Sequence, residues 1–315
     1  MSGQIILFGA TGTVGRAVAA ELVAAGWSVS APLRRPAEVP GVKTIVVDPG
    51  DAVALSSALA PLRPDAVISC MASRDGRPAD SWAVDRDATI RSFEAAQAAG
   101  ARRAILVSAI CVQKPKLDFQ FAKLEAEAWL ANSGMAWSVV RPTALFKSLS
   151  GQIHRVRSGK PFLVFGSGEL TSCTPISDRD LGRYVVDVLE DEAQVGKILP
   201  IGGPGPALTP LAIAAELFHQ TKLRRRVKHV PLGAMDLVIG GLSLAGRLSP
   251  AMADKAAFAR IGRYYATESM LVWDEAQGVY DRALTPSYGS DTLQDHFRRV
   301  LAGEIEVDLG EHAVF

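Results

Sequence analysis

Three glycines spaced by three residues, close to the start of the chain, constrain the fold more than any other feature. They follow the apolar run at residues 5–8 and precede an Ala- and Val-rich stretch at residues 16–25. The first glycine permits a tight turn, the second lets a pyrophosphate approach the backbone, and the third lets the helix pack on the strand. Anionic oxygens then lie at the amino end of the helix. The sequence therefore predicts a dinucleotide-binding turn, with cofactor contacts from Gly9, Thr11, Gly12, Thr13, Val14 and Gly15.

The end of the second predicted strand favours a phosphorylated cofactor. Enzymes that use NAD usually carry Asp or Glu there, which accepts a hydrogen bond from the ribose 2′-hydroxyl. This chain instead has Arg34 and Arg35, about 20 residues after the glycines. Two guanidinium groups favour a 2′-phosphate, so we expect NADPH. Asp48, after the third predicted strand, is a candidate for the adenine side, although an ordinary polar turn explains it equally well.

Strand-like and helix-like segments alternate along the first half of the chain. We expect further strands at residues 43–47, 65–70, 103–108 and 137–142, and helices at residues 82–99 and 119–132. Such repeats are typical of an α/β fold, a Rossmann-type doubly wound parallel sheet. We expect an NADP-binding Rossmann domain in residues 1–155 and a smaller C-terminal substrate-binding portion in residues 156–315, of which about 174–202 returns to the core.

Ligands of such sheets bind beyond the carboxyl ends of the strands. Residues at two of these ends are therefore further candidates for the cofactor site. We expect Cys70, Met71 and Ala72 near the ribose and pyrophosphate, and Pro142 and Thr143 beside the nicotinamide.

Composition excludes several classes of function. With 34 Lys and Arg against 33 Asp and Glu, no global field indicates nucleic acid. The three cysteines and five histidines lack the spacing of a disulfide framework or a zinc site, so no metal site is expected. The first strand begins too early for a signal peptide, which favours the cytoplasm. The apolar stretch at residues 230–248 is too short and too polar to span a bilayer, but peripheral membrane contact stays open.

A missing tyrosine narrows the chemistry. The chain resembles the short-chain dehydrogenase/reductase superfamily in its atypical, NmrA-like branch, where a Ser after the fifth strand acts with Tyr and Lys four residues apart on the next helix. Ser108 and Lys123 occupy two of these places, but Phe119 stands where tyrosine is expected. Carbonyl reduction creates an alkoxide that needs such a proton partner. Reduction of a conjugated carbon–carbon double bond needs hydride placement and an electrostatic sink instead.

Segments in the second half point to one family. The stretches 141–149, 200–205, 262–271 and 285–293, together with the Phe-Gln-x-Ala-Lys-Leu stretch at residues 119–124, closely resemble divinyl chlorophyllide and protochlorophyllide 8-vinyl-reductases. The resemblance spans nearly the whole chain. It implies an NADPH-dependent oxidoreductase of chlorophyll and bacteriochlorophyll biosynthesis that reduces the 8-vinyl group of a magnesium tetrapyrrole to ethyl. Another NADPH-dependent reductase of conjugated alkenes, or a non-catalytic dinucleotide sensor, remains an alternative.

Within this interpretation Lys123 and Ser108 are the catalytic candidates. Lys123 would hold the nicotinamide ribose and stabilise transient negative charge, whereas Ser108 would contact ribose or substrate. The proton source is open between Lys123 through a water, Tyr264 or Tyr265, and bulk solvent. The substrate brings its own magnesium, for which His154, His219 or His229 is a conceivable axial ligand. The expected substrate contacts are Phe119, Phe146, Met235, Tyr264, Met270 and Trp273.

Overall fold

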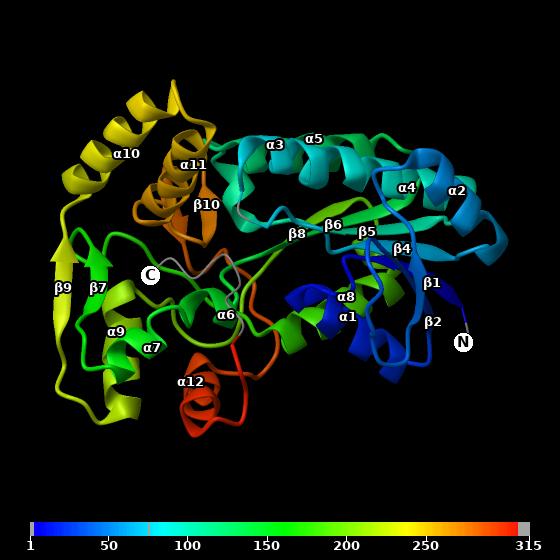
Figure 1. Ribbon diagram of the computed structural model, residues 1–315. Helices are drawn as coiled ribbons and strands as arrows, with labels where there is room; N and C mark the ends of the chain where they lie inside the picture. Colours follow the sequence, from blue (N-terminus) through cyan, green and yellow to red (C-terminus); the bar gives the residue numbers. More distant parts are fainter. Residues whose placement is uncertain (1–2, 75, 308–315) are drawn as a thin grey trace.

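Seven parallel strands form the centre of the molecule, in the order β3-β2-β1-β4-β5-β6-β8 (Figure 1). The computed structural model describes residues 3–74 and 76–307. The predicted doubly wound parallel sheet is confirmed. The strands are β1 (Gln4–Phe8), β2 (Ser28–Leu33), β3 (Lys43–Val46), β4 (Ala66–Ser69), β5 (Arg103–Val107), β6 (Ala136–Pro142) and β8 (Lys197–Ile201).

Helices cover both faces of the sheet (Figure 1). On one face α1 (Thr13–Ala24) packs against α8 (Asp178–Glu190), and Gly182 allows this contact, because a Cβ there would lie 2.9 Å from the Ala17 backbone. The other face is covered by α2 (Ala52–Leu59), α4 (Thr89–Ala98) and α5 (Asp118–Ala131). Both faces of the strands are therefore buried, as their nearly continuous apolar sequence requires.

One stretch departs from the regular helix that its sequence predicts. Residues 82–99 do not form a single α-helix: a short turn, α3 (Pro78–Asp80), leads into a π-helical segment, Ser81–Ala88, before α4 begins. Helix α2, whose amino end is capped by the side chain of Asp51, was not among the helices expected from the sequence. Runs of π-helix are rare and occur frequently at functional sites. This one carries a buried carboxylate, Asp85.

The C-terminal half adds a smaller unit beside the sheet. Its core contains Phe146, Val156, Phe218 and Phe297, drawn from four helices. The elements are α6 (Phe146–Leu149), α7 (Ile153–Arg157), β7 (Phe162–Phe165), α9 (Pro210–Thr221), β9 (Val227–Val230), α10 (Leu232–Gly246), α11 (Pro250–Tyr265), β10 (Val272–Asp274), β11 (Val279–Asp281) and α12 (Leu293–Ala302). Three further pieces complete the unit: the parallel strand pair β7–β9, the antiparallel strand pair β10–β11 and the helical hairpin α10–α11 (Figure 1).

Two of the segments that carry the family resemblance join this unit to the sheet. Gly202, just after β8, donates its N–H to the carbonyl of Pro286 at 2.9 Å and accepts from Tyr288 N–H at 2.9 Å. Gly203 packs so closely on the preceding loop that a Cβ would lie 2.0 Å from Pro175 O. The buried carboxylate of Asp180 accepts hydrogen bonds from the backbone N–H of residues 290 and 291. These segments therefore attach the C-terminal unit to the sheet and its helices.

Candidate active site at the carboxyl edge of the sheet

The glycine turn has the shape that a pyrophosphate requires. Gly9 has φ +76°, and its carbonyl accepts a hydrogen bond from Gly12 N–H at 3.0 Å. A Cβ on Gly15 would lie 2.0 Å from that same carbonyl oxygen, so only glycine fits there. At Gly12, in contrast, a Cβ would meet only Gly9 O, at 3.4 Å. Because Gly12 is the N-cap of α1 and has no side chain, the first amides of the helix stay uncapped and accessible to an anion.

A lysine that the sequence analysis did not single out lies at this turn. The ammonium of Lys147, on α6, donates to the hydroxyl of Thr13 at 3.1 Å. This contact brings a positive charge to the amino end of α1, which suits a pyrophosphate. Lys147 belongs to the stretch 141–149 quoted for the family resemblance, so that motif was the available signal.

The end of β4 passes against the glycine turn. A Cβ on Gly9 would lie 2.7 Å from the Cys70 carbonyl and 2.9 Å from Met71 N, so these residues adjoin the turn. Burial raises the pKa of the Cys70 thiol to about 12, which keeps it protonated. Thr143, after β6, is buried and donates its hydroxyl to the carbonyl of Thr174. The structure thus places these two strand ends at the edge of the sheet that carries the turn.

Two arginines follow β2 at the same edge. Arg34 and Arg35 are exposed, and within the described part of the chain neither forms an ion pair. Their guanidinium groups are therefore available to a ligand. Asp48, after the neighbouring β3, is also exposed, but its carboxylate accepts the N–H of Gly50 at 2.8 Å and so stabilises its own turn. This contact matches the ordinary polar turn that the sequence also allowed.

Lys123 forms a buried ion pair that the sequence did not predict. Its Nζ lies 2.8 Å from Oδ1 of Asp85, on the π-helical segment, and the two residues are only 8% and 2% exposed. Asp85 Oδ1 also accepts the N–H of Ser73, after β4, at 3.3 Å. Asp85 therefore fixes the lysine relative to the strand end. No sequence motif connects the two residues, because they lie on separate helices that only packing brings together.

Buried polar atoms with no partner in the described chain gather in the elements around this pair. The hydroxyl of Ser108, after β5, and Oδ2 of Asp85 both make no hydrogen bond in the part of the chain that is described. The same holds for the hydroxyls of Ser69, at the end of β4, and Ser81, on the π-helical segment. Native proteins rarely leave such atoms unsatisfied without a ligand, water or catalytic role. The arrangement suits a polar ligand at this edge of the sheet.

Phe119 lies on α5, one turn before Lys123, and packs in a small cluster with Cys111 and Tyr264. The Tyr264 phenol is buried and donates to the carbonyls of Cys111 at 2.9 Å and Lys114 at 3.1 Å. Burial raises the pKa of this phenol, with a further rise from the nearby Cys111. Tyr264 is therefore occupied in holding the loop after β5. Tyr265 donates instead to the Cys111 sulfur, at 3.6 Å.

The other residues expected to contact the substrate lie in different parts of the C-terminal unit. Phe146 is a core residue of the smaller unit, and its ring lies tilted against that of His296 with centroids 5.4 Å apart, so the structure gives it a packing role. Met270 packs on the same core, and Met235 lies half-buried on α10. Trp273, on β10, meets the Tyr280 ring edge to face, with ring centroids 4.9 Å apart. A pattern of apolar residues cannot separate packing from ligand contact, which is why these six residues looked alike in the sequence.

A buried carboxylate ties the loop after β5 to the C-terminal unit. Glu268 accepts hydrogen bonds from Lys114 and Lys116 of the loop, and from the Tyr280 hydroxyl at 2.7 Å. Burial alone would raise the pKa of Glu268, but these hydrogen bonds hold it below its usual value. Lys114 also lies 3.8 Å from the Trp273 ring centroid, a cation–π contact. The loop that follows Ser108 is thus anchored at several points.

Comparison with known proteins places this geometry in a family. An NAD(P)H-binding family model matches residues 9–192. The divinyl chlorophyllide a 8-vinyl-reductase of Oryza sativa subsp. indica is 43% identical, over 99% of this chain and 82% of the relative. The protein of the same name from Cucumis sativus is also 43% identical, over 99% of this chain and 80% of the relative.

The chain belongs to the divinyl chlorophyllide a 8-vinyl-reductase family. The family predicted from the sequence is thereby confirmed, and so is a nicotinamide cofactor. An Escherichia coli NADPH-dependent quinone oxidoreductase complexed with NADPH has a TM-score of 0.66 at 20% identity, covering 94% of this chain and 99% of its own. MoeE5 in complex with UDP-glucose and NAD has a TM-score of 0.68 at 19% identity, covering 95% and 100%. At such identities these structures bear on the fold alone.

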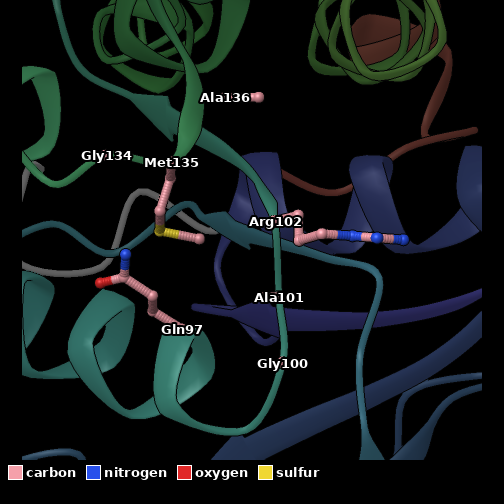
Figure 2. Close-up of a pocket in the computed structure, with 7 residues that line it drawn as sticks. All are labelled: Gln97, Gly100, Ala101, Arg102, Gly134, Met135 and Ala136. Atoms are coloured by element: carbon pink, nitrogen blue, oxygen red, sulfur yellow. The ribbon is translucent and has the colours of Figure 1, made fainter.

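One hollow in this family member lies away from the dinucleotide turn. Its volume is about 470 Å³, and it is lined by Gln97, Met135 and residues 100–102 at the amino ends of β5 and β6. Figure 2 shows the Met135 and Gln97 side chains on one side of residues 100–102, with the Arg102 side chain extending to the other. The glycine turn follows the carboxyl end of β1, the opposite edge of the parallel sheet. The hollow is therefore not part of the candidate site.

A smaller hollow, of about 180 Å³, lies between α6, β7 and α11 and is lined in part by Tyr265, Gly262 and Leu149. It adjoins the Cys111 cluster through Tyr265. The three histidines considered as magnesium ligands are exposed, and His229 hydrogen-bonds to Gly166 O at 2.9 Å. Among residues 3–74 and 76–307, no group of three His, Cys, Asp or Glu could hold a metal ion.

Proposed function

We propose that this protein reduces the 8-vinyl group of a divinyl chlorophyllide or protochlorophyllide to ethyl, with NADPH as the reductant. The observation that carries the proposal is the 43% identity to reductases of that name along 99% of the chain. The site agrees with it, because Phe119 leaves no phenol beside Lys123, as reduction of a conjugated double bond permits. The magnesium in this reaction would belong to the tetrapyrrole substrate and not to a metal site of the protein.

The residues at the carboxyl edge fit NADPH. The uncapped amino end of α1 and the Lys147 ammonium suit the pyrophosphate. Arg34 and Arg35, exposed and without acidic partners in the described chain, suit a 2′-phosphate. Asp48, Cys70, Met71, Ala72, Pro142 and Thr143 stay proposed contacts along the rest of the cofactor.

When bound, NADPH would supply a hydride to the terminal carbon of the vinyl group, and one proton added at the inner carbon completes the ethyl group. Lys123 is proposed to hold the nicotinamide ribose and to stabilise negative charge that develops on the conjugated ring. Asp85 holds its ammonium in a fixed position. The Asp85 carboxylate also neutralises much of the positive charge of Lys123. We therefore propose that Lys123 contributes more by orienting the ribose than by stabilising negative charge. Ser108 is proposed to donate its hydroxyl to ribose or substrate.

For the proton we propose Lys123 acting through a water, with bulk solvent as the second candidate. The Tyr264 and Tyr265 phenols are poor donors, because burial raises the pKa of both and each already donates its proton to the Cys111 region. We propose Phe119, Tyr264 and Trp273 as the apolar side against which the tetrapyrrole lies. We do not include Phe146 and Met270, because they pack in the core of the smaller unit. We also leave out Met235, because it lies on α10.

The direct test is turnover. Purified protein is incubated with NADPH and divinyl chlorophyllide, and the expected result is a blue shift of the Soret band with a mass gain of two hydrogens. The reaction is repeated with NADH, for which a lower rate is expected. Reduction of simple enones without any response to divinyl tetrapyrroles would select a different alkene reductase. NADPH binding without oxidation by any of these substrates would indicate a dinucleotide sensor.

We further propose that the enzyme works at the surface of photosynthetic membranes, where its apolar substrate would partition. The described part of the chain contains no helix with the length and apolar character needed to cross a bilayer.

A further inference from the structure

Helix α10 leaves its apolar side chains in water. None of its 15 residues is buried. Leu237 is 79% exposed, Val238 56% and Leu244 65%, and Leu248, just after the helix, is 94% exposed. Single exposed leucines are ordinary on protein surfaces, but a contiguous group marks an interaction site. In Figure 1, α10 projects at the outer end of the molecule, away from the sheet.

The opposite side of α10 explains why the helix keeps its place. It packs along α11, and Asp236 pairs with Arg263 of that helix at 2.7 Å. Gly246 lets the two helices approach closely, since a Cβ there would lie 2.9 Å from Ala253 Cα. At Gly233, Gly240 and Gly241, in contrast, a Cβ would meet no atom within 4 Å. One side of the helix is thus fixed and the other is open.

The exposed apolar side chains continue next to α10. Leu170 is 49% exposed. Its side chain and that of Leu232 both lie beside Gly166, since a Cβ there would contact each of them. Leu223, before β9, is 43% exposed. The apolar surface therefore extends from α10 toward the β7 and β9 pair.

Positive charge gathers in the stretch that leads through β9 to this apolar surface. From Glu216 to Asp254 the chain has six Lys and Arg and three carboxylates, of which Asp236 and Asp254 are already paired with arginines. Five of these cations lie in the stretch 222–228, which is exposed and runs into β9. Strand β9 leads into α10 through Pro231, and Figure 1 shows the two elements following one another along the same outer side. An apolar helix with a basic border is typical of proteins that lie on anionic membranes.

We propose that α10, together with the basic stretch 222–229, binds the surface of a membrane that contains anionic lipids. Leu237, Val238, Leu244 and Leu248 enter the boundary between headgroups and acyl chains, and Lys222, Arg224, Arg225 and Lys228 contact the headgroups. The charge argues for lipid over a second copy of this chain, because two such faces would place their cations against each other. The proposal does not depend on vinyl reduction and holds whatever the substrate.

The test uses the full chain and vesicles sedimented from solution. We compare vesicles of phosphatidylcholine alone with vesicles in which a third of the lipid is phosphatidylglycerol. Binding is expected to be at least about tenfold stronger to the anionic vesicles, and to weaken as salt is raised. Equal binding to both kinds of vesicle, or binding to neither, would overturn the proposal.

Two variants separate the apolar and the charged contributions. Leu237→Asn with Leu244→Asn is expected to weaken binding about tenfold or more, because two apolar side chains that would enter the lipid are lost. Lys222→Gln with Arg224→Gln and Arg225→Gln is expected to weaken it roughly a hundredfold. Leu284→Asn, at a side chain 50% exposed elsewhere, and Lys43→Gln with Arg102→Gln are the matched controls and should bind as wild type.

Thermal unfolding of each variant checks that the fold is intact, and size-exclusion chromatography with light scattering reports the oligomeric state. Both variants change only exposed side chains, so their melting temperatures should match wild type. If the leucine variant instead turned a dimer into a monomer and left vesicle binding unchanged, α10 would be an interface between copies and the lipid proposal would be wrong.

Discussion

The ammonium of Lys123 lies 2.8 Å from Oδ1 of Asp85, and neither residue is open to solvent. We expect Asp85→Asn to lower kcat by about tenfold to a hundredfold, because the lysine loses the group that orients it. Removing one partner of a buried ion pair also costs about 3–5 kcal/mol in the free energy of unfolding. Steady-state kinetics and urea denaturation measure the two effects.

A double variant distinguishes orientation from stability. Asp85→Asn combined with Lys123→Met leaves no buried charge without a partner, so it should recover part of the lost stability and none of the lost turnover. Asp87→Asn, a carboxylate on the same segment that pairs with Arg86 at 2.6 Å, is the matched control and should behave like wild type. Normal turnover in the single Asp85 variant would remove Asp85 from the proposed mechanism.

Two glycines of the turn should respond differently to alanine. Gly12 has φ −74°, which alanine adopts readily, and an open position for a Cβ, so Gly12→Ala should fold normally. Its new methyl group occupies the space proposed for the pyrophosphate, so NADPH affinity should fall about tenfold or more. Gly15→Ala should lower the melting temperature as well, because its Cβ would strike Gly9 O at 2.0 Å. Fluorescence titration with NADPH and thermal unfolding check this, and tight binding by Gly12→Ala would argue against the site.

Cofactor selectivity should depend on the two arginines after β2. Arg34→Ala with Arg35→Ala is expected to raise KM for NADPH by about tenfold to a hundredfold, since two charge-assisted contacts to the 2′-phosphate are lost. KM for NADH should change little, because that cofactor lacks the phosphate. Arg102→Ala, at an exposed arginine on the opposite edge of the sheet, serves as the control. A parallel loss for both cofactors would contradict the assignment.

Gly289 is expected to be essential for attaching the C-terminal segment. It has φ +82°, and a Cβ there would lie 2.2 Å from the carboxylate of Asp180. Gly289→Ala should cost about 3 kcal/mol of unfolding free energy, from the left-handed backbone and the displaced hydrogen bonds. Gly278→Ala is the matched control: it has φ +68° but open space, so only the backbone cost of about 1 kcal/mol applies. Similar losses in both variants would show that the contact with Asp180 is not what matters.

Acid should weaken the anchor formed by Glu268. Its pKa in the folded protein is lowered from an ordinary value of 4.5, so its contribution to stability is fully present above pH 4.5 and is lost as pH falls through the lowered value. The melting temperature of wild type should therefore exceed that of Glu268→Gln at neutral pH, and the difference should shrink below about pH 4.5. Glu275→Gln, at an exposed carboxylate nearby, should show no such convergence. A difference that stays constant into acid would mean that ionisation of Glu268 does not stabilise the fold.

The sequence by itself determined the parts of this protein that depend on neighbouring residues. A turn is predicted at Gly9, Gly12 and Gly15 because the positive φ of Gly9 and the contact of Gly15 with Gly9 O involve residues close together in the sequence. The alternation of apolar strands and helices predicted the parallel sheet, because the length and apolar pattern of each element lie within its own segment. The family resemblance in residues 262–271 and 285–293 was correct, although those residues turn out to hold the C-terminal unit in place.

Only the tertiary structure decided the partner of Lys123 and the contacts of the apolar residues. Asp85 was invisible as a site residue because a single carboxylate on a helix carries no signal until packing places it against Lys123. Phe146 and Trp273 are both apolar aromatic residues, yet one lies in a core and the other beside a lysine. Long-range contacts of this kind follow from how the helices pack, a property of the whole chain that local sequence patterns do not record.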